Sequence, residues 1–303
     1  MIFRVLLFSL LLPIGVAHAA ISPTNLATNG TNTDATSVAT ASISPSANTL
    51  ILASIGSEVA SGTANEPTAS GNGLTWVVVA TRVQGLHRIT VFRALGASPS
   101  ADALTFDFAG QTQLTFVWSV IEVSGADTSG ANGSGAVIQS AVNSTSGTQV
   151  LTVTLGAFAN TANATFGFFY IDANNGFTAG SGFAIVAQTS CCGSRQASEW
   201  VISNDTTVDI TWGVSNATSA GIALEIQPPV ASPFGVGGQF LSALEWLGSW
   251  LAPPDAEAAI PAAASADFRF ALGYLVCDFY SDVVDDNATD TTVKLQECIN
   301  DAS

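Results

Sequence analysis

The stretch that decides the fold reads Leu104-Thr105-Phe106-Asp107-Phe108 and then, after a short polar interval, Leu114-Thr115-Phe116-Val117-Trp118-Ser119-Val120-Ile121. Large apolar side chains stand at every second position of both segments. A repeat of two places such side chains on one face of a β-strand. The stretch therefore predicts two neighbouring strands, each with one face in a core and the other toward solvent.

The same alternation runs from about residue 21 to residue 227, and no helical repeat competes with it there. Turn-forming Gly and Asn separate the segments, as in Ser70–Gly73 and Asn174–Gly176. No internal repeat with a clear period is evident. The pattern favours one mainly β domain, an antiparallel β-sandwich of jelly-roll size. Its further expected strands are 49–55, 74–83, 88–95, 136–142, 151–155, 164–171, 183–189, 198–203, 208–212 and 222–226.

Composition divides the rest of the chain. Residues 20–47 are rich in Ser, Thr, Asn and Ala, which predicts an extended lead-in to a sandwich over 48–227. Prolines and glycines mark 228–238 as a linker. Residues 239–303 are acidic and are expected to form a small helical appendage. Within it, 267–284 suits either a helix or a strand, and helix is preferred because Asp267 can cap it.

The N-terminus has the layout of a secretory signal peptide. Arg4 precedes a short apolar run, and Ala17-His18-Ala19 forms a small-residue cleavage site. The run is too short to span ~30 Å of hydrocarbon. We expect residues 1–19 to be removed and the protein to be secreted or held at the cell surface, periplasmic or extracellular, without a stable transmembrane span.

Charge and composition exclude several classes of function. The chain of 303 residues has 7 basic and 23 acidic residues, a net charge of -16, and 48% hydrophobic residues. Nucleic acid is excluded as the main partner, because binding phosphates needs a surplus of Lys and Arg. Histidine occurs only twice, so no metal and no cofactor is expected.

Export to an oxidising compartment allows the four cysteines to pair. Cys277 and Cys298 stand 21 positions apart in the C-terminal region, whereas Cys191 and Cys192 are adjacent. We expect a bridge between Cys277 and Cys298. The adjacent pair forms a vicinal ring or stays as thiols.

Catalytic motifs are scarce. The one histidine of the mature chain, His87, falls in Gln84-Gly85-Leu86-His87, a predicted hairpin tip where it would be solvated. Glycoside hydrolysis needs two carboxylates ~5–9.5 Å apart, one with a raised pKa. Glu122 and Glu225 are the best-placed candidates, and Asp107, Asp209 and Glu199 are weaker ones. We expect all of these acids to face solvent and to have no catalytic role. No catalytic residue is therefore assigned.

Weak binding candidates are two tryptophans and a basic hairpin. Trp118 and Trp212 fall in the apolar register and are expected in the core, whereas Trp76 and Trp200 stand nearer strand ends and could stack on a sugar ring. Arg82, Arg88 and Arg93 gather with His87 on the 74–95 hairpin. They form a contact face for an acidic partner or, as we prefer, are isolated surface arginines.

Three short segments carry a resemblance to a known family: Gly73-Leu74-Thr75-Trp76, Ile89–Ala94, and Trp118–Asp127, with Gly221–Ile226 continuing it. Over residues 35–227 the chain resembles β-sandwich modules, jelly-roll or concanavalin-like, of bacterial cell-surface proteins and phage virion proteins. The resemblance implies a structural or adhesive role and no catalytic residues. The signal peptide favours an exported bacterial protein.

Two functions follow as expectations. The first is a non-catalytic structural or adhesive protein of the cell surface or a virion, with surface glycans or other surface or virion proteins as partners. The alternative is a carbohydrate-binding, lectin-like module or a glycoside-active enzyme. A concave face holding Trp76 or Trp200, with two carboxylates opposed across it, would favour the alternative.

Overall fold

The computed structural model describes residues 20–158, 160–173, 175–213 and 217–229. Every strand pairing in this part is antiparallel, and the prediction of a mainly β chain is confirmed. The predicted signal peptide, the helical appendage and Cys277 with Cys298 lie outside the described residues. The strands are β1 (Ser22–Thr31), β2 (Ser37–Ile43), β3 (Leu50–Glu58), β4 (Thr68–Ser70), β5 (Val77–Gln84), β6 (His87–Ala94), β7 (Asp102–Asp107), β8 (Thr115–Ser124), β9 (Val137–Thr148), β10 (Val150–Thr154), β11 (Ala164–Ile171), β12 (Phe177–Thr178), β13 (Ala184–Cys191), β14 (Ser194–Val201), β15 (Thr207–Trp212) and β16 (Ala217–Ile226).

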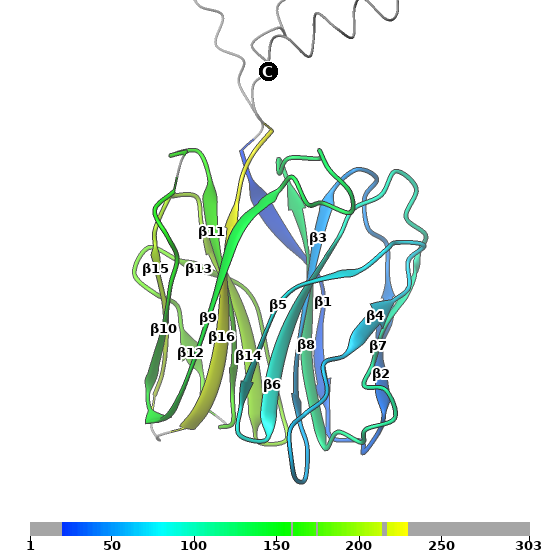
Figure 1. Cartoon of the computed structure of the whole chain (residues 1–303), viewed down its shortest axis with the longest axis vertical. Coiled ribbons are helices and arrows are strands. Elements are labelled where there is room, and N and C mark those ends of the chain that lie inside the picture. The colour runs from blue at the N-terminus through cyan, green and yellow to red at the C-terminus, as the bar shows by residue number, and fades with distance from the viewer. Residues whose placement is uncertain (1–19, 159, 174, 214–216, 230–303) are drawn as a thin grey trace, which may run out of the picture. The chain divides into compact units, whose positions relative to one another are not determined.

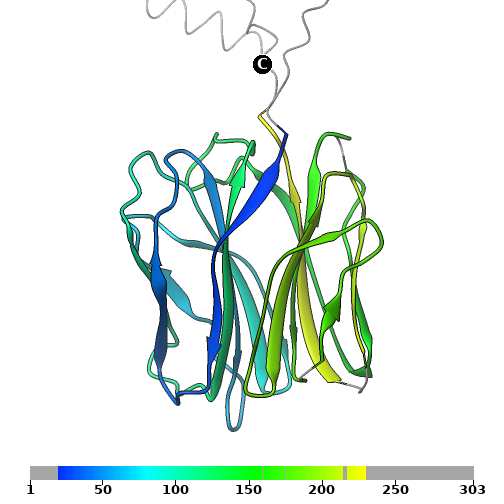
Figure 2. The same ribbon diagram turned by 180° about the vertical axis from the view of Figure 1, so that it is seen from behind.

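These strands form four sheets stacked as layers (Figures 1 and 2). The N-terminal large sheet has the order β1-β8-β3-β6-β5, and the C-terminal large sheet has the order β13-β14-β11-β16-β9. The two large sheets face each other. A small sheet covers the outer face of each: β2-β7-β4 on the N-terminal side and β10-β15-β12 on the C-terminal side.

The strand order of the first half repeats in the second. Adding eight to each number of β1-β8-β3-β6-β5 gives β9-β16-β11-β14-β13, which is the C-terminal large sheet. The same operation converts β2-β7-β4 into β10-β15-β12. The described chain is therefore a tandem duplication in topology, although its sequence shows no repeat with a clear period.

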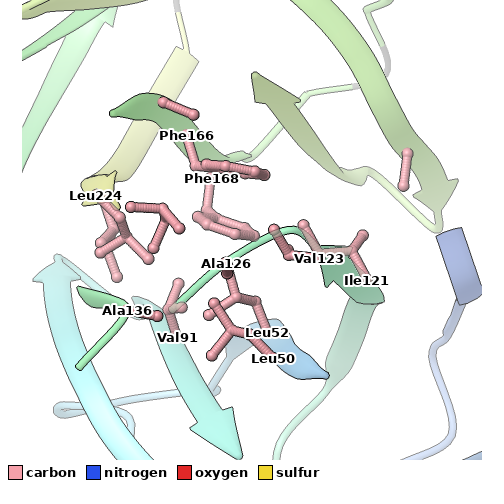
Figure 3. Packing of buried hydrophobic residues seen from close by; sticks show 14 of the residues in the cluster. Leu50, Leu52, Val91, Ile121, Val123, Ala126, Ala136, Phe166, Phe168 and Leu224 are labelled. Atoms are coloured by element: carbon pink, nitrogen blue, oxygen red, sulfur yellow. The ribbon is translucent and has the colours of Figure 1, made fainter. Parts of the chain in front are cut away.

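The central core lies between the two large sheets. Leu50, Leu52 and Val91 of one sheet meet Phe166 and Phe168 of the other (Figure 3). The opposite faces of the same sheets are also buried, because the small sheets cover them. The expectation that each strand turns one face to solvent is therefore wrong for the central strands of the large sheets, such as β3, β8 and β11. In β8, Phe116 and Val120 enter the outer core while Ile121 enters the central one.

A polar network crosses the central core. The Ser119 Oγ lies 2.9 Å from the Ser54 Oγ in its own sheet and 2.7 Å from the Ser198 Oγ in the facing sheet. The Gln196 amide donates to the Ser54 carbonyl oxygen at 3.2 Å and accepts from the Gly56 N–H at 3.2 Å. These bonds satisfy groups that would be costly to bury alone, and they fix the register of one large sheet against the other.

The sandwich begins earlier than the predicted boundary at residue 48. β1 pairs with β8, and β2 pairs with β7. The expected lead-in over 20–47 thus belongs to the sheets. The Ser- and Thr-rich composition hides this because β1 is an edge strand whose side chains are mostly exposed or half-buried.

Candidate functional site

His87 occupies the first position of β6 and is only 6% exposed. The hairpin before it is closed by Gly85, whose φ of +61° suits the first central position of a tight turn. The Gln84–His87 pair ends the ladder between β5 and β6, so the turn itself consists of Gly85 and Leu86. The expectation of a solvated histidine is wrong, because the facing sheet covers the imidazole.

Two carboxylates flank the buried imidazole. The His87 Nε2 lies 3.6 Å from the Glu58 Oε1 and 3.5 Å from the Asp172 Oδ2. The Glu58 side chain is 24% exposed and that of Asp172 is 43% exposed. The cluster is therefore buried on its histidine side and open to water on its carboxylate side.

The tandem architecture explains why these residues meet. Glu58 ends β3 and is the register partner of His87. β11 is the counterpart of β3, and Asp172 follows its last residue, with the Asp172 N–H bonded to the Thr218 carbonyl oxygen at 2.9 Å. The Ile171–Arg195 pair places Ser194 opposite Asp172. Each half thus contributes one acid at the same place, at the end of the layers opposite to the end of β16 (Figures 1 and 2).

Tyr170 forms the inner wall of this cluster. Its ring centroid lies 5.4 Å from that of His87, and its hydroxyl lies 2.8 Å from the Ser194 Oγ. Burial raises the pKa of the Tyr170 hydroxyl well above its ordinary range. The Ser194 hydrogen bond opposes that shift, and the charges of Glu58 and Asp172 add to it. Burial therefore favours the neutral phenol form of Tyr170.

The predicted basic face is split between two sides of the N-terminal large sheet. Arg82 pairs with Ile89 of the central core and donates to the Ser144 Oγ of β9 at 2.9 Å. Arg88 donates from its Nε to the Ala64 carbonyl oxygen at 2.7 Å and lies 3.7 Å from Glu66. Burial lowers the pKa of Arg88, and the Glu66 charge partly offsets this. These arginines are engaged individually, so they do not form one contact face.

Arg93 is half-buried on β6, and its Nε has no hydrogen-bond partner among the described residues. It is register partner to Leu52 of β3 and Val77 of β5. His87 and Arg93 stand at opposite ends of β6. The structure therefore does not gather Arg93 with the histidine cluster.

The tryptophans singled out in the sequence pack against the apolar cores and do not project into solvent. Trp118 and Trp212 are 4% and 2% exposed, which confirms their predicted core positions. Trp76 packs partly buried against the N-terminal outer core and donates its Nε1–H to the Gly71 carbonyl oxygen at 3.2 Å. Trp200 packs against the central core, 6.0 Å from the Phe166 ring. Trp76 and Trp200 thus belong to different cores and share no sugar platform.

The prediction that the candidate acids face solvent is wrong for some of them. Glu225 is 1% exposed and accepts hydrogen bonds at 2.5 Å from the Asn163 and Gln139 side-chain amides. Glu122 occupies the corresponding position of β8, half-buried, and accepts from the Ser46 N–H at 2.6 Å. The two lie in different large sheets, each with its own local partners, and do not oppose each other.

Glu199 is buried completely, at 0% exposure, on the face of β14 that enters the C-terminal outer core. Its Oε2 accepts the Gly180 N–H at 3.1 Å, and its Oε1 has no hydrogen-bond partner among the described residues. Burial raises the pKa of Glu199 to about 8, the Gly180 bond lowers it somewhat, and the charge of Asp209 raises it. The prediction of a solvent-facing acid is wrong here.

Cys191 and Cys192 form a disulfide with each other, the first of the two alternatives left open for this pair. They stand at the β13–β14 hairpin, where Cys191 pairs with Ser194 and the turn consists of Cys192 and Gly193. Both turn residues have positive φ, +61° and +104°. That combination defines the type I′ turn, which matches the twist of a two-residue hairpin.

Comparisons with known proteins found no matching family profile, no matching curated protein and no matching solved structure. Within the described residues there is no helix long and apolar enough to span a membrane.

Proposed function

We propose that the chain is an exported, non-catalytic structural or adhesive protein of the cell surface or a virion. The observation that carries the proposal is the arrangement of Glu122 and Glu225. They occupy matching positions in separate sheets and are held by local partners. Hydrolysis of a glycosidic bond needs two carboxylates opposed across one cleft, and this pair lacks that geometry.

The strand order supports the resemblance to jelly-roll modules. In each half the first, eighth, third and sixth strands are adjacent in the large sheet, and the second, seventh and fourth form the small one. That is the order of a jelly roll, with the fifth strand joined to the large sheet. Double sheets of this kind serve as structural modules in viral capsids and as binding modules in lectins. We propose two such units in tandem, followed by the helical appendage.

An exposed edge strand supports a role in contacts. β9 forms an edge of the C-terminal large sheet, and Ile138 and Val142 on it are 45% and 39% exposed. An edge strand with exposed apolar side chains can accept a strand from another molecule. Surface glycans remain the alternative partners, to be contacted through the polar loops.

The absence of glycosidase activity is the first testable prediction. Neither the wild-type protein nor the Glu122→Gln/Glu225→Gln double variant is expected to release reducing sugar from a panel of plant, bacterial and animal polysaccharides. The same preparations on a glycan array test sugar binding separately. Sugar release by the wild type that is lost in the double variant would replace the structural proposal with the glycosidase alternative.

Export is tested by the mature N-terminus. Cleavage after Ala19 predicts that the exported protein begins at Ala20. Its envelope or extracellular fraction, analysed by N-terminal sequencing, should contain no chain that retains Met1. An Arg4→Glu variant, whose leader lacks its positive charge, should accumulate uncleaved inside the cell. Recovery of the intact chain from a membrane fraction would contradict the proposal.

A further inference from the structure

We propose that Glu58, His87 and Asp172 bind a divalent transition-metal ion, with Zn²⁺ as the probe, at the junction of the two halves. This inference does not depend on the proposed function. One ligand atom from each residue lies within 4.8 Å of the others. The sequence led us to expect no metal, because His87 is alone in the mature chain and its two partners stand 29 and 85 positions away from it.

The distances fit a tetrahedral ion. Zinc binds imidazole nitrogen at about 2.0–2.1 Å and carboxylate oxygen at about 2.0–2.2 Å, so two ligand atoms on one tetrahedral ion stand roughly 3.3–3.5 Å apart. The His87 Nε2 lies 3.6 Å and 3.5 Å from the two carboxylate oxygens. Both separations are too long for a hydrogen bond of ordinary strength. They match the spacing of a nitrogen ligand and its two oxygen neighbours around one ion, and ligand oxygens of the two acids lie within 4.8 Å of each other.

The buried imidazole needs a partner. The His87 side chain is 8% exposed, and neither ring nitrogen has a hydrogen-bond partner among the described residues. A buried polar atom without a partner destabilises the fold, because it has lost its hydrogen bonds to water and gained none in return. An ion on Nε2 supplies that partner, and its charge is balanced by the carboxylates of Glu58 and Asp172.

The ligand set selects the class of metal and leaves room for a fourth ligand. Imidazole nitrogen suits zinc and its neighbours, whereas calcium and magnesium prefer oxygen alone. The half-exposed Asp172 carboxylate gives the ion a path from solvent. Three protein ligands leave one tetrahedral position open to water. Because Glu58 and His87 come from one large sheet and Asp172 follows β11 of the other, the ion would tie the central layers together.

The experiment is a calorimetric titration of the untagged mature chain with Zn²⁺ at pH 7.5, after removal of metals by a chelator. We expect one strong site. His87→Gln and Asp172→Asn should each weaken it at least about 100-fold, since changes in mere outer-shell partners already cost about 10–100-fold. Asp34→Asn is the matched control: it removes the same charge from an exposed aspartate and should leave binding unchanged.

Two further measurements distinguish a bound ion from a simple charge pairing of His87 with the two acids. Co²⁺ in the site should show the strong visible absorption of tetrahedral cobalt, and His87→Gln should abolish it. Zn²⁺ should raise the melting temperature of the wild type and not that of His87→Gln. If zinc binds equally well to His87→Gln, the ligands lie elsewhere and the proposal is overturned. It also fails if Zn²⁺ does not bind to the wild type, whatever the effect of His87→Gln on stability.

Discussion

Replacing Phe168 by alanine is expected to lower the free energy of unfolding by about 3–5 kcal/mol, the usual cost of truncating a buried aromatic side chain. Phe168 has 0% exposure and lies in the central core, among side chains of both large sheets (Figure 3). For a domain of this size the melting temperature should fall by roughly 6–20 °C. Thermal and urea unfolding, followed by circular dichroism and tryptophan fluorescence, measure the change.

The number of transitions tests whether the two halves fold as one unit. Their shared central core and the network around Gln196 predict one cooperative transition. Phe106→Ala provides the comparison, because Phe106 is equally buried but lies in the outer core of the N-terminal half alone. Both variants should shift the same single transition. Two transitions, each moved by only one variant, would mean that the halves unfold independently.

The alternation of large side chains was sufficient to predict the strands but not the layers. All twelve predicted strands are present, because residues such as Leu104 and Phe106 fill one face of their strand at every second position. Four strands escaped prediction: β1 and β2 lie in the polar Ser- and Thr-rich stretch, and β4 and β12 have only three and two residues. One signal was overlooked: Val117 and Ile121 of β8 are also apolar, although they lie on the other face of the strand. They indicate that this second face is buried too. Strands buried on both faces read as nearly continuous apolar runs, and four layers follow from that.

The histidine cluster was beyond prediction from local pattern. His87 was visible as a lone histidine, but its environment depends on Asp172, which belongs to the other half of the chain. The signal was an acid at the end of each of two matching strands, with Glu58 as the last residue of β3 and Asp172 directly after β11. This signal can be recognised only once the matching strand order of the two halves is known, because the sequence shows no repeat with a clear period.

Glu199 makes the stability of the fold depend on pH. Its carboxyl has a pKa of about 8 in the folded protein, raised from 4.5 by burial foremost. Between these two values the unfolded chain has released the proton that the folded chain keeps. The Glu199 carboxyl therefore stabilises the folded state most below about pH 4.5, and this contribution to the free energy of unfolding is lost as the pH rises to about 8. One pKa unit corresponds to about 1.4 kcal/mol, so the shift from 4.5 to about 8 corresponds to a total loss of about 5 kcal/mol.

Glu199→Gln should remove this loss, because glutamine has nearly the shape of the protonated acid and no proton to release. The variant is expected to match the wild type near pH 4.5 and to exceed its free energy of unfolding by about 4 kcal/mol at pH 8. Urea denaturation midpoints at intervals across this range measure the difference. Glu122→Gln, which removes a half-buried carboxylate from β8, should give no such gain at pH 8. Parallel pH profiles for the wild type and Glu199→Gln would show that the Glu199 carboxyl is already ionised in the folded protein.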